Sequence, residues 1–170
     1  MNEVRFDKKL FRAKLDELLR GSEVQHQEIF NKVESWMDSG KPGLLLMGSV
    51  GTGKSKIARA IRWAWCKFLT VADMKKCDWI ADQIKIDSDW VNEISRAKGL
   101  MVLDDLGTES KVWNEESMLP ILFHRIDNWM PTVITTNLNT DQIRQRYGER
   151  VADRLRAYDK IVMNYELLRK

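Results

Sequence analysis

The strongest constraint on how this chain can fold is the eight-residue stretch GSVGTGKS at positions 48–55. It fits the pattern G-x-x-x-x-G-K-[ST], in which a glycine-rich loop surrounds the phosphates of a nucleotide. The flanks agree, because an apolar run at 44–47 leads into the stretch and a helix-forming segment at 56–69 follows it. A plain glycine-rich turn is the alternative, and it would not require this spacing together with these flanks. We therefore predict a strand, a phosphate-binding loop and a helix in this order.

The parts of the loop have distinct expected roles. Backbone N–H groups and the positive end of the following helix would converge on one anionic site. Lys54 would bring its charge to the β and γ phosphates, and the hydroxyl of Ser55 would bind Mg²⁺. The residues predicted to bind the nucleotide are Gly48, Ser49, Val50, Gly51, Thr52, Gly53, Lys54 and Ser55.

Length and composition predict one globular domain. Of the 170 residues, 44% are hydrophobic and 31% charged, and no apolar run approaches the ~20 residues that cross a bilayer. We expect no membrane contact and a cytoplasmic location, since the first residues lack the apolar core of a secretion signal. Cys66 and Cys77 have neither a CxxC spacing nor a nearby histidine, so we predict neither a disulfide nor a metal site there.

Hydrophobic periodicity predicts helices that alternate with strands. The expected helices cover residues 6–19, 23–37, 56–69, a polar segment ending at 96, 115–129 and 141–147. The expected strands cover residues 43–47, 67–71, 100–103, 132–136 and 160–165. This alternation indicates an α/β fold with a parallel sheet covered by helices on both faces, in which ligands bind beyond the carboxyl ends of the strands.

Two acids and an amide follow predicted strands. Asp104 and Asp105 close the apolar run 100–103. Beside a phosphate loop the first acid would help to hold Mg²⁺, and the second would orient or deprotonate the attacking water. Asn137 follows the strand 132–136 and would position the γ phosphate or that water. The alternatives are that the acids cap a helix or start a turn, and that Asn137 is only a turn residue.

Arg150 and Arg154 are four residues apart, so they would share one face of a helix. Either could sense phosphate, and an arginine inserted from a neighbouring subunit would stabilise the charge on the transferred phosphoryl group. Surface pairing with Glu149 or Asp153 is the alternative. From Arg144 to the C-terminus there are eight Lys or Arg against four Asp or Glu. This basic segment would attract a polyanion such as DNA, or it is an ordinary solvated helix face.

Four motifs, GSVGTGKS, LMVLDDLGTE, VITTN and GERVADRLR, together resemble those of the AAA+ ATPases. The resemblance extends from residue 25 to residue 165 and is greatest to the DnaC-type helicase loaders and the similar IstB-type transposition helpers. It implies Walker A at 48–55, Walker B at 100–105, sensor 1 at Asn137 and an arginine finger at Arg150. Arg154 would be the second-choice finger or a nearby phosphate sensor. The implied cofactors are ATP and Mg²⁺, and the implied partners are single-stranded DNA, a replicative helicase or a transposase, and further copies of the chain.

The chain also departs from these relatives. We expect residues 1–22 to form a short amphipathic helix, which packs on the core or docks a partner, where helicase loaders usually have a separate domain. Residues 23–170 would be the AAA+ core. Only sixteen residues follow Arg154, which is too few for the helical lid of many AAA+ proteins. We therefore predict a lid that is absent or minimal.

The expected function is that of an ATP-hydrolysing protein that acts on DNA, in replication as a helicase-loader-like factor or in transposition as an IstB-like helper. Most of the seven tryptophans (36, 63, 65, 79, 90, 113 and 129) are expected in the core, and exposed members would stack on unpaired bases. A small-molecule kinase is an alternative, although the pair Asn137 and Arg150 speaks against it. A nucleotide-bound scaffold with little turnover is another, because Asp105 stands where many members of the wider class carry Glu.

Overall fold

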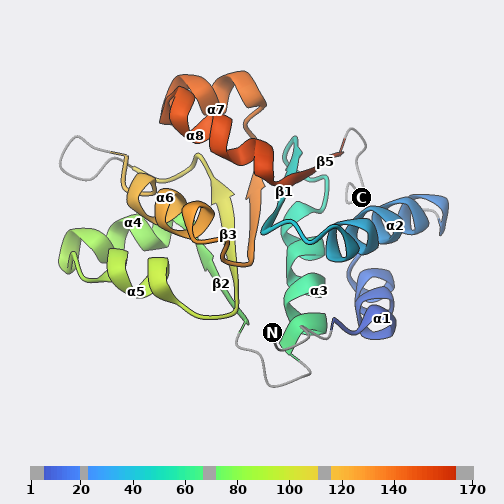
Figure 1. The fold of residues 1–170 in the computed structure, drawn as a ribbon. Coiled ribbons are helices and arrows are strands. Elements are labelled where there is room, and N and C mark those ends of the chain that lie inside the picture. Colours follow the sequence, from blue (N-terminus) through green and yellow to red (C-terminus); the bar gives the residue numbers. More distant parts are fainter. Residues whose placement is uncertain (1–5, 20–22, 67–71, 111–115, 164–170) are drawn as a thin grey trace.

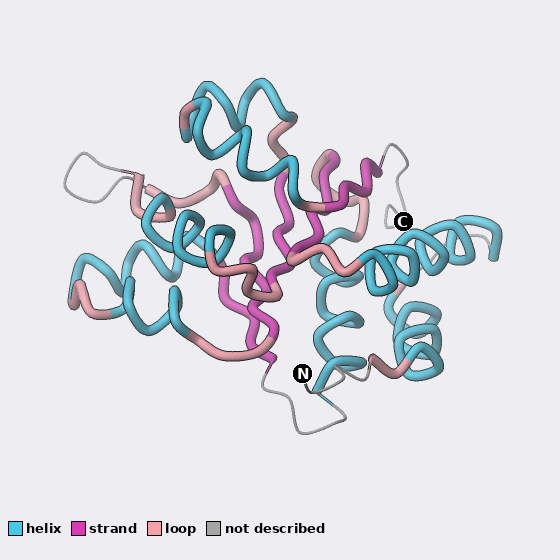
Figure 2. Tube along the Cα trace, viewed as in Figure 1, coloured by secondary structure: helices cyan, strands magenta, loops and turns pink. Residues whose placement is uncertain are grey.

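The core of the molecule is a parallel β-sheet that lies between two groups of helices (Figure 1, Figure 2). The computed structural model describes residues 6–19, 23–66, 72–110 and 116–163. Within these ranges five strands pair in the order β2-β3-β4-β1-β5, and every pair is parallel. The strands are β1 (Gly43–Gly48), β2 (Ala72–Lys76), β3 (Leu100–Leu106), β4 (Thr132–Thr136) and β5 (Asp159–Met163). The predicted α/β fold with a parallel sheet is confirmed.

The helices connect these strands in chain order. They are α1 (Lys8–Leu18), α2 (Glu23–Ser39), α3 (Lys54–Cys66), α4 (Cys77–Ile86), α5 (Trp90–Arg96), α6 (Leu119–Asp127), α7 (Thr140–Tyr147) and α8 (Glu149–Arg154), and a 3₁₀ turn (Leu155–Ala157) follows α8. In the described part of the chain no helix has both the length and the apolar composition for a membrane crossing.

Several predicted boundaries differ from the observed ones. The strand predicted at 67–71 lies outside the described residues, and β2 occupies 72–76 instead. The helix predicted at 56–69 begins earlier, at Lys54, because the helical turn starts inside the phosphate loop. The helix predicted from 115 begins at Leu119, with a proline in its first turn, where a missing backbone N–H is tolerated.

The two faces of the sheet bury different residues of the same strands. In β1, Leu44 and Leu46 pack in a hydrophobic cluster with α1, α2 and α3. Leu45 and Met47 pack in a second cluster with α4, α6 and α7. This alternation follows from the two-residue period of a strand, and it explains why the strand reads as a continuous apolar run. Both faces of the sheet are therefore covered, as Figure 1 shows.

The N-terminal helix α1 packs on the core of the molecule. Phe11 and Leu15 of α1 are fully buried in the same cluster as Ile57 and Ile61 of α3. The helix starts at a capped end, because the side chain of Asp7 accepts a hydrogen bond of 2.9 Å from the backbone N–H of Leu10. The apolar face of α1 is thus used by the core.

A buried arginine holds the segments that precede the amino ends of β3 and β4. Arg125 of α6 is 0% exposed, and its guanidinium donates to the carbonyl oxygens of Ile94, Ala97, Gly99 and Pro131. Burial lowers its pKa to about 10, so the group still carries its charge at neutral pH. One side chain therefore joins α6 to the segments that lead into β3 and β4.

The pairing of β3 with β4 is irregular at the carboxyl end of β3. Leu103 pairs with Ile134, whereas Leu106 pairs with Thr136. Three steps along β3 thus match two along β4, which is the geometry of a β-bulge. Asp104 and Asp105 lie in this bulge, and Asp105 has a φ of +58°. A bulge changes the direction in which a side chain points, and here it affects the two predicted acids.

Candidate nucleotide site

The glycine-rich stretch joins β1 to α3 at the carboxyl edge of the sheet (Figure 1). At Gly48 a Cβ atom would lie 2.4 Å from the carbonyl oxygen of Met163, so β5 leaves no room for a side chain. Within the loop the hydroxyl of Thr52 donates to the carbonyl of Ser49 over 2.9 Å. Because α3 begins at Lys54, its unpaired N–H groups lie beside this loop, where an anion can bind.

Lys54 is buried within its own loop. The side chain is 5% exposed, and its Nζ donates to the carbonyl oxygens of Gly48 and Ser49, each over 2.7 Å. Burial lowers the pKa of Lys54, while the negative charges of Asp105 and Asp104 act in the opposite direction. The ammonium group therefore lies within electrostatic reach of both acids.

Asp104 is held by the neighbouring strand. It is 3% exposed, and the hydroxyl of Thr135 on β4 donates to its Oδ1 over 2.7 Å. The same hydroxyl oxygen accepts a hydrogen bond of 2.8 Å from the backbone N–H of Asp105. Thr135 thus connects the side chain of one acid to the backbone of the next, and both acids have a fixed position relative to β4.

Asp105 adopts a left-handed backbone conformation, which costs a non-glycine residue on the order of 1 kcal/mol. Its carbonyl oxygen accepts hydrogen bonds from the backbone N–H and the hydroxyl of Thr108, over 3.1 and 2.8 Å. Burial and the adjacent Asp104 raise the pKa of the Asp105 carboxyl above its ordinary value. A carboxylate with a raised pKa is better suited to accept a proton than an ordinary surface acid.

A cavity of about 400 Å³ brings these parts together. It is lined by Val50, Gly51, Gly53, Lys54, Ser55, Lys56, Arg59, Asp105, Thr108 and Asn137. The glycine-rich loop, the second acid and the strand-end amide, which are far apart in the sequence, therefore border one space. Asp104 lies behind this lining, adjacent to Asp105 at the bulge.

Some lining residues were not singled out from the sequence. Lys56 and Arg59 extend the positive charge of the loop along α3, and Arg59 is one helical turn beyond Ser55. Residues four apart lie on the same face of a helix, so the spacing of Arg59 from Ser55 would have been enough to predict that Arg59 lies near the site. Thr108 of the lining carried no local signal, and neither did Thr135, which does not line the cavity, because their roles depend on the bulge and on the register between β3 and β4.

The two predicted arginines lie on α8, away from this cavity. Neither is among the residues that line it. The guanidinium carbons of Arg150 and Arg154 lie 5.5 and 4.9 Å from the ring centre of Phe123 on α6. Arg154 also forms an ion pair with Asp127 at 2.6 Å, whereas Arg150 is exposed. The structure thus brings the loop, Asp105 and Asn137 together, and places both arginines away from them.

The acidic neighbours of these arginines form their ion pairs with other residues, and Arg154 forms its own with Asp127. Glu149 pairs with Arg144 at 2.7 Å, and Asp153 pairs with Arg156 at 2.9 Å. Residues adjacent in a helix point in different directions, so Arg150 and Arg154 cannot easily reach the acids that precede them.

The donor set fits magnesium better than a transition metal. Among the described residues no group of three or more His, Cys, Asp or Glu side chains could hold a metal ion by itself. Mg²⁺ instead binds one or two protein oxygens together with phosphate oxygens and water. The hydroxyl of Ser55 on the cavity wall and the buried carboxylate of Asp104 are oxygen ligands of this kind.

Comparison with known proteins gives the context of this geometry. No protein-family model matches the chain. The replicative helicase loader DnaC of Escherichia coli strain K12 is 27% identical over 154 residues, which cover 84% of this chain and 59% of that protein. The chain thus spans well under two thirds of the length of this curated relative.

Solved structures agree in fold. A crystal structure of the DnaC helicase loader matches with a TM-score of 0.70 and 22% identity, and covers 92% of this chain and 98% of the DnaC chain. A crystal structure of DnaI has a TM-score of 0.72 and 23% identity, with 95% and 93% of the two chains covered. AMPPCP-bound DnaA from Aquifex aeolicus has a TM-score of 0.66 and 16% identity, and the match covers 93% of this chain and 51% of DnaA.

The sequence similarity, the strand order and the position of the glycine-rich loop point to the same relatives. The chain is a homologue of the DnaC helicase loaders, with the fold of the AAA+ P-loop ATPases.

Proposed function

We propose that the chain binds Mg²⁺ and ATP in this cavity and hydrolyses the ATP, with a neighbouring copy completing the site. The observation that carries the proposal is the meeting of Lys54, Asp105 and Asn137 around one space, at the N-terminus of α3. A phosphate loop alone would support nucleotide binding. The added acid and amide support hydrolysis, because they can orient a water molecule beside the terminal phosphate.

Each residue of the site then has a role. The backbone of the glycine-rich loop and Lys54 would bind the phosphates, and Ser55 and Asp104 would hold Mg²⁺, which would supply positive charge to offset that of the phosphates. Asp105 orients or deprotonates the attacking water, and its raised pKa favours the second of these roles. Asn137 positions the water or the γ phosphate with an uncharged amide.

The arginine finger is assigned to Arg150 and acts on the site of a neighbouring subunit. Arg150 is exposed on α8 and does not line its own cavity, which is the placement that a residue acting in trans requires. The ion pair of Arg154 with Asp127 instead holds α8 against α6. Arg154 therefore supports the position of Arg150 and is the second choice for the finger.

The biological role is assigned from the relatives. Similarity to a replicative helicase loader supports a role in DNA replication, with a replicative helicase as partner. The basic segment from Arg144 onward supports single-stranded DNA as a second partner. Among the described tryptophans, Trp129 is 64% exposed and is available to stack on unpaired bases, whereas Trp36 and Trp65 are buried. The ring of Trp79 lies against Lys75 and Trp90.

The test is ATP turnover per molecule across a range of protein concentrations, with and without single-stranded DNA. A shared site predicts turnover that rises with protein concentration, and a DNA-dependent role predicts a further rise with DNA. Duplex DNA of the same length is the control for unspecific charge effects. Turnover that is flat in protein concentration and indifferent to DNA would contradict the proposal.

A further inference from the structure

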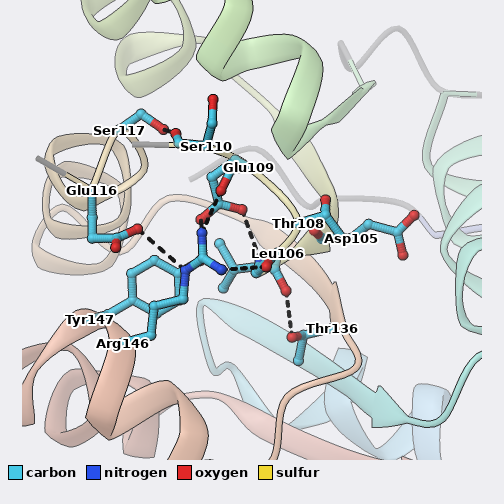
Figure 3. Close-up of polar contacts among 11 residues, drawn as sticks. Asp105, Leu106, Thr108, Glu109, Ser110, Glu116, Ser117, Thr136, Arg146 and Tyr147 are labelled. Atoms are coloured by element: carbon cyan, nitrogen blue, oxygen red, sulfur yellow. Dashed lines mark hydrogen bonds and ion pairs between the residues drawn. The ribbon is translucent and has the colours of Figure 1, made fainter. Parts of the chain in front are cut away.

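The segment that follows Asp105 is attached to the end of α7 by a polar cluster (Figure 3). The cluster consists of Glu109, Arg146 and Tyr147, which we call the Glu109 cluster. The side chain of Glu109 is 0% exposed. In Figure 3 the side chains of Arg146 and Tyr147 approach the 105–110 segment from α7. None of these three residues lines the nucleotide cavity.

The buried carboxylate of Glu109 joins two parts of the chain. Its Oε2 accepts a hydrogen bond of 2.8 Å from the backbone N–H of Gly107, and its Oε1 accepts one from the hydroxyl of Tyr147. The guanidinium of Arg146 lies 3.5 Å from the same Oε1. Burial and the Glu109 charge raise the pKa of Tyr147, so its hydroxyl keeps its proton and donates. A buried carboxylate without such partners would be strongly destabilising.

Arg146 also binds the backbone of the same segment. Its two terminal nitrogens each donate over 2.5 Å, one to the carbonyl of Gly107 and the other to the carbonyl of Glu109. Its Nε is 3.3 Å from Glu116 Oε2, which fixes the guanidinium from the opposite side. The planar fork of an arginine can hold two carbonyl groups at once, whereas a lysine offers a single charged centre.

The segment needs such support because its backbone is strained. The strain lies at Asp105, a non-glycine residue with a φ of +58°, whereas Gly107 adopts its φ of +106° freely because it lacks a Cβ atom. A Cβ atom at Gly107 would lie 2.7 Å from Leu138 Cδ1, so the turn also passes close to the segment after β4. Asp105 and Thr108 line the nucleotide cavity from this turn. Strained conformations persist only when surrounding contacts determine them.

We propose that the Glu109 cluster is a positioning clamp, which holds Asp105 and Thr108 in the cavity and links their movement to the helix that carries Arg150. The link is short, because Arg146 and Tyr147 are the last two residues of α7 and Gly148 leads directly into α8. A shift of the 105–110 segment on loss of the γ phosphate would therefore move Arg150, which serves the neighbouring subunit. The clamp rests on the proposed ATPase function, and the residues of the cluster are positioning residues.

Two variants test the clamp. Tyr147→Phe removes the hydroxyl that donates to Glu109. Arg146→Lys keeps the positive charge but loses the planar guanidinium that donates to two carbonyl groups. The matched control is Gln145→Ala, because Gln145 lies on the same helix next to Arg146 and is exposed. Turnover is measured per bound nucleotide, with a fluorescent ATP analogue to count sites, so that a loss of folded protein does not appear as a loss of activity.

We expect Arg146→Lys to reduce turnover per bound nucleotide by about tenfold or more, since small displacements of a catalytic group have effects of this size. Tyr147→Phe should give a smaller reduction. The KM for ATP should change by less than about twofold, because the loop that binds the phosphates is not altered. Turnover of both variants equal to that of Gln145→Ala would overturn the clamp.

Hydrogen exchange gives a second readout that does not depend on hydrolysis. In the wild-type protein, Mg²⁺ and AMPPCP should slow exchange in 48–55, 105–110 and 149–154 together. In Tyr147→Phe the protection of 48–55 should persist, and that of 149–154 should be lost. Equal protection of 149–154 in both proteins would overturn the clamp. If the wild-type protein shows no turnover at any concentration, the proposed ATPase function fails, and the exchange result alone decides on the clamp.

Discussion

Replacing Thr135 with valine removes one hydroxyl that connects both acids of the site, while the β-branched shape of the side chain is kept. This hydroxyl is fully buried, donates to Asp104 over 2.7 Å and accepts from the N–H of Asp105 over 2.8 Å. A hydrogen bond to a charged group contributes about 1.5–3 kcal/mol, and one between neutral groups about 1 kcal/mol. We therefore expect Thr135→Val to lower the free energy of unfolding by about 2–4 kcal/mol.

The assay is urea unfolding without Mg²⁺ or nucleotide, with the midpoint compared at constant m-value. Thr135→Ser is the matched control, because it keeps the hydroxyl and loses only a buried methyl group, at about 1 kcal/mol. The valine variant should be clearly the less stable of the two. If Thr135→Val is as stable as Thr135→Ser, the hydroxyl does not hold the acids in place, and the reasoning is refuted.

Three further variants test the remaining roles. Lys54→Ala should abolish the binding of a fluorescent ATP analogue, because the loop loses its charge toward the phosphates; unchanged affinity would contradict this. Arg150→Ala should bind the analogue normally but lose the ATP hydrolysis that depends on protein concentration. Normal turnover of this variant at high protein concentration would refute the assignment of Arg150 as the arginine finger. In the folded protein, burial and the charge of Asp104 raise the pKa of Asp105 above its ordinary value of 3.8. Ionisation of Asp105 is therefore less favourable in the folded than in the unfolded chain, and the free energy of unfolding decreases as the pH rises past 3.8. Asp105→Asn, which tolerates a positive φ, should therefore raise the thermal midpoint near pH 7, bring no gain below about pH 3.8, and stop hydrolysis; a lowered midpoint near pH 7 would contradict this.

The fold and the outline of the site could be predicted because they depend on local patterns. Two apolar runs and one β-branched run, followed by Gly48, Asp104 and Asn137, mark strand ends, and the carboxyl ends of parallel strands share one edge of the sheet. It follows from this geometry that the side chains after the strands come close together. The order of the strands was not needed for that prediction.

The supporting contacts could not be predicted, since they join residues that no local pattern relates. Glu109 and Arg146 are 37 positions apart in the sequence, and Arg146 resembles any basic residue near a helix end. Arg125 occurs in an otherwise apolar helix face, but its burial depends on carbonyl groups of other segments. The role of Thr135 requires the bulge between β3 and β4, which the β-branched pattern does not indicate.

The most direct test of the shared site is to mix two inactive variants. Lys54→Ala cannot bind nucleotide but still presents Arg150, and Arg150→Ala binds nucleotide but lacks the finger. Each variant alone should be inactive. A site formed by two subunits predicts that an equal mixture recovers about a quarter of wild-type turnover, because a random assembly pairs an intact cavity with an intact neighbouring finger at that frequency. A mixture as inactive as its components, at concentrations where the wild-type protein is active, would contradict a site completed in trans by Arg150.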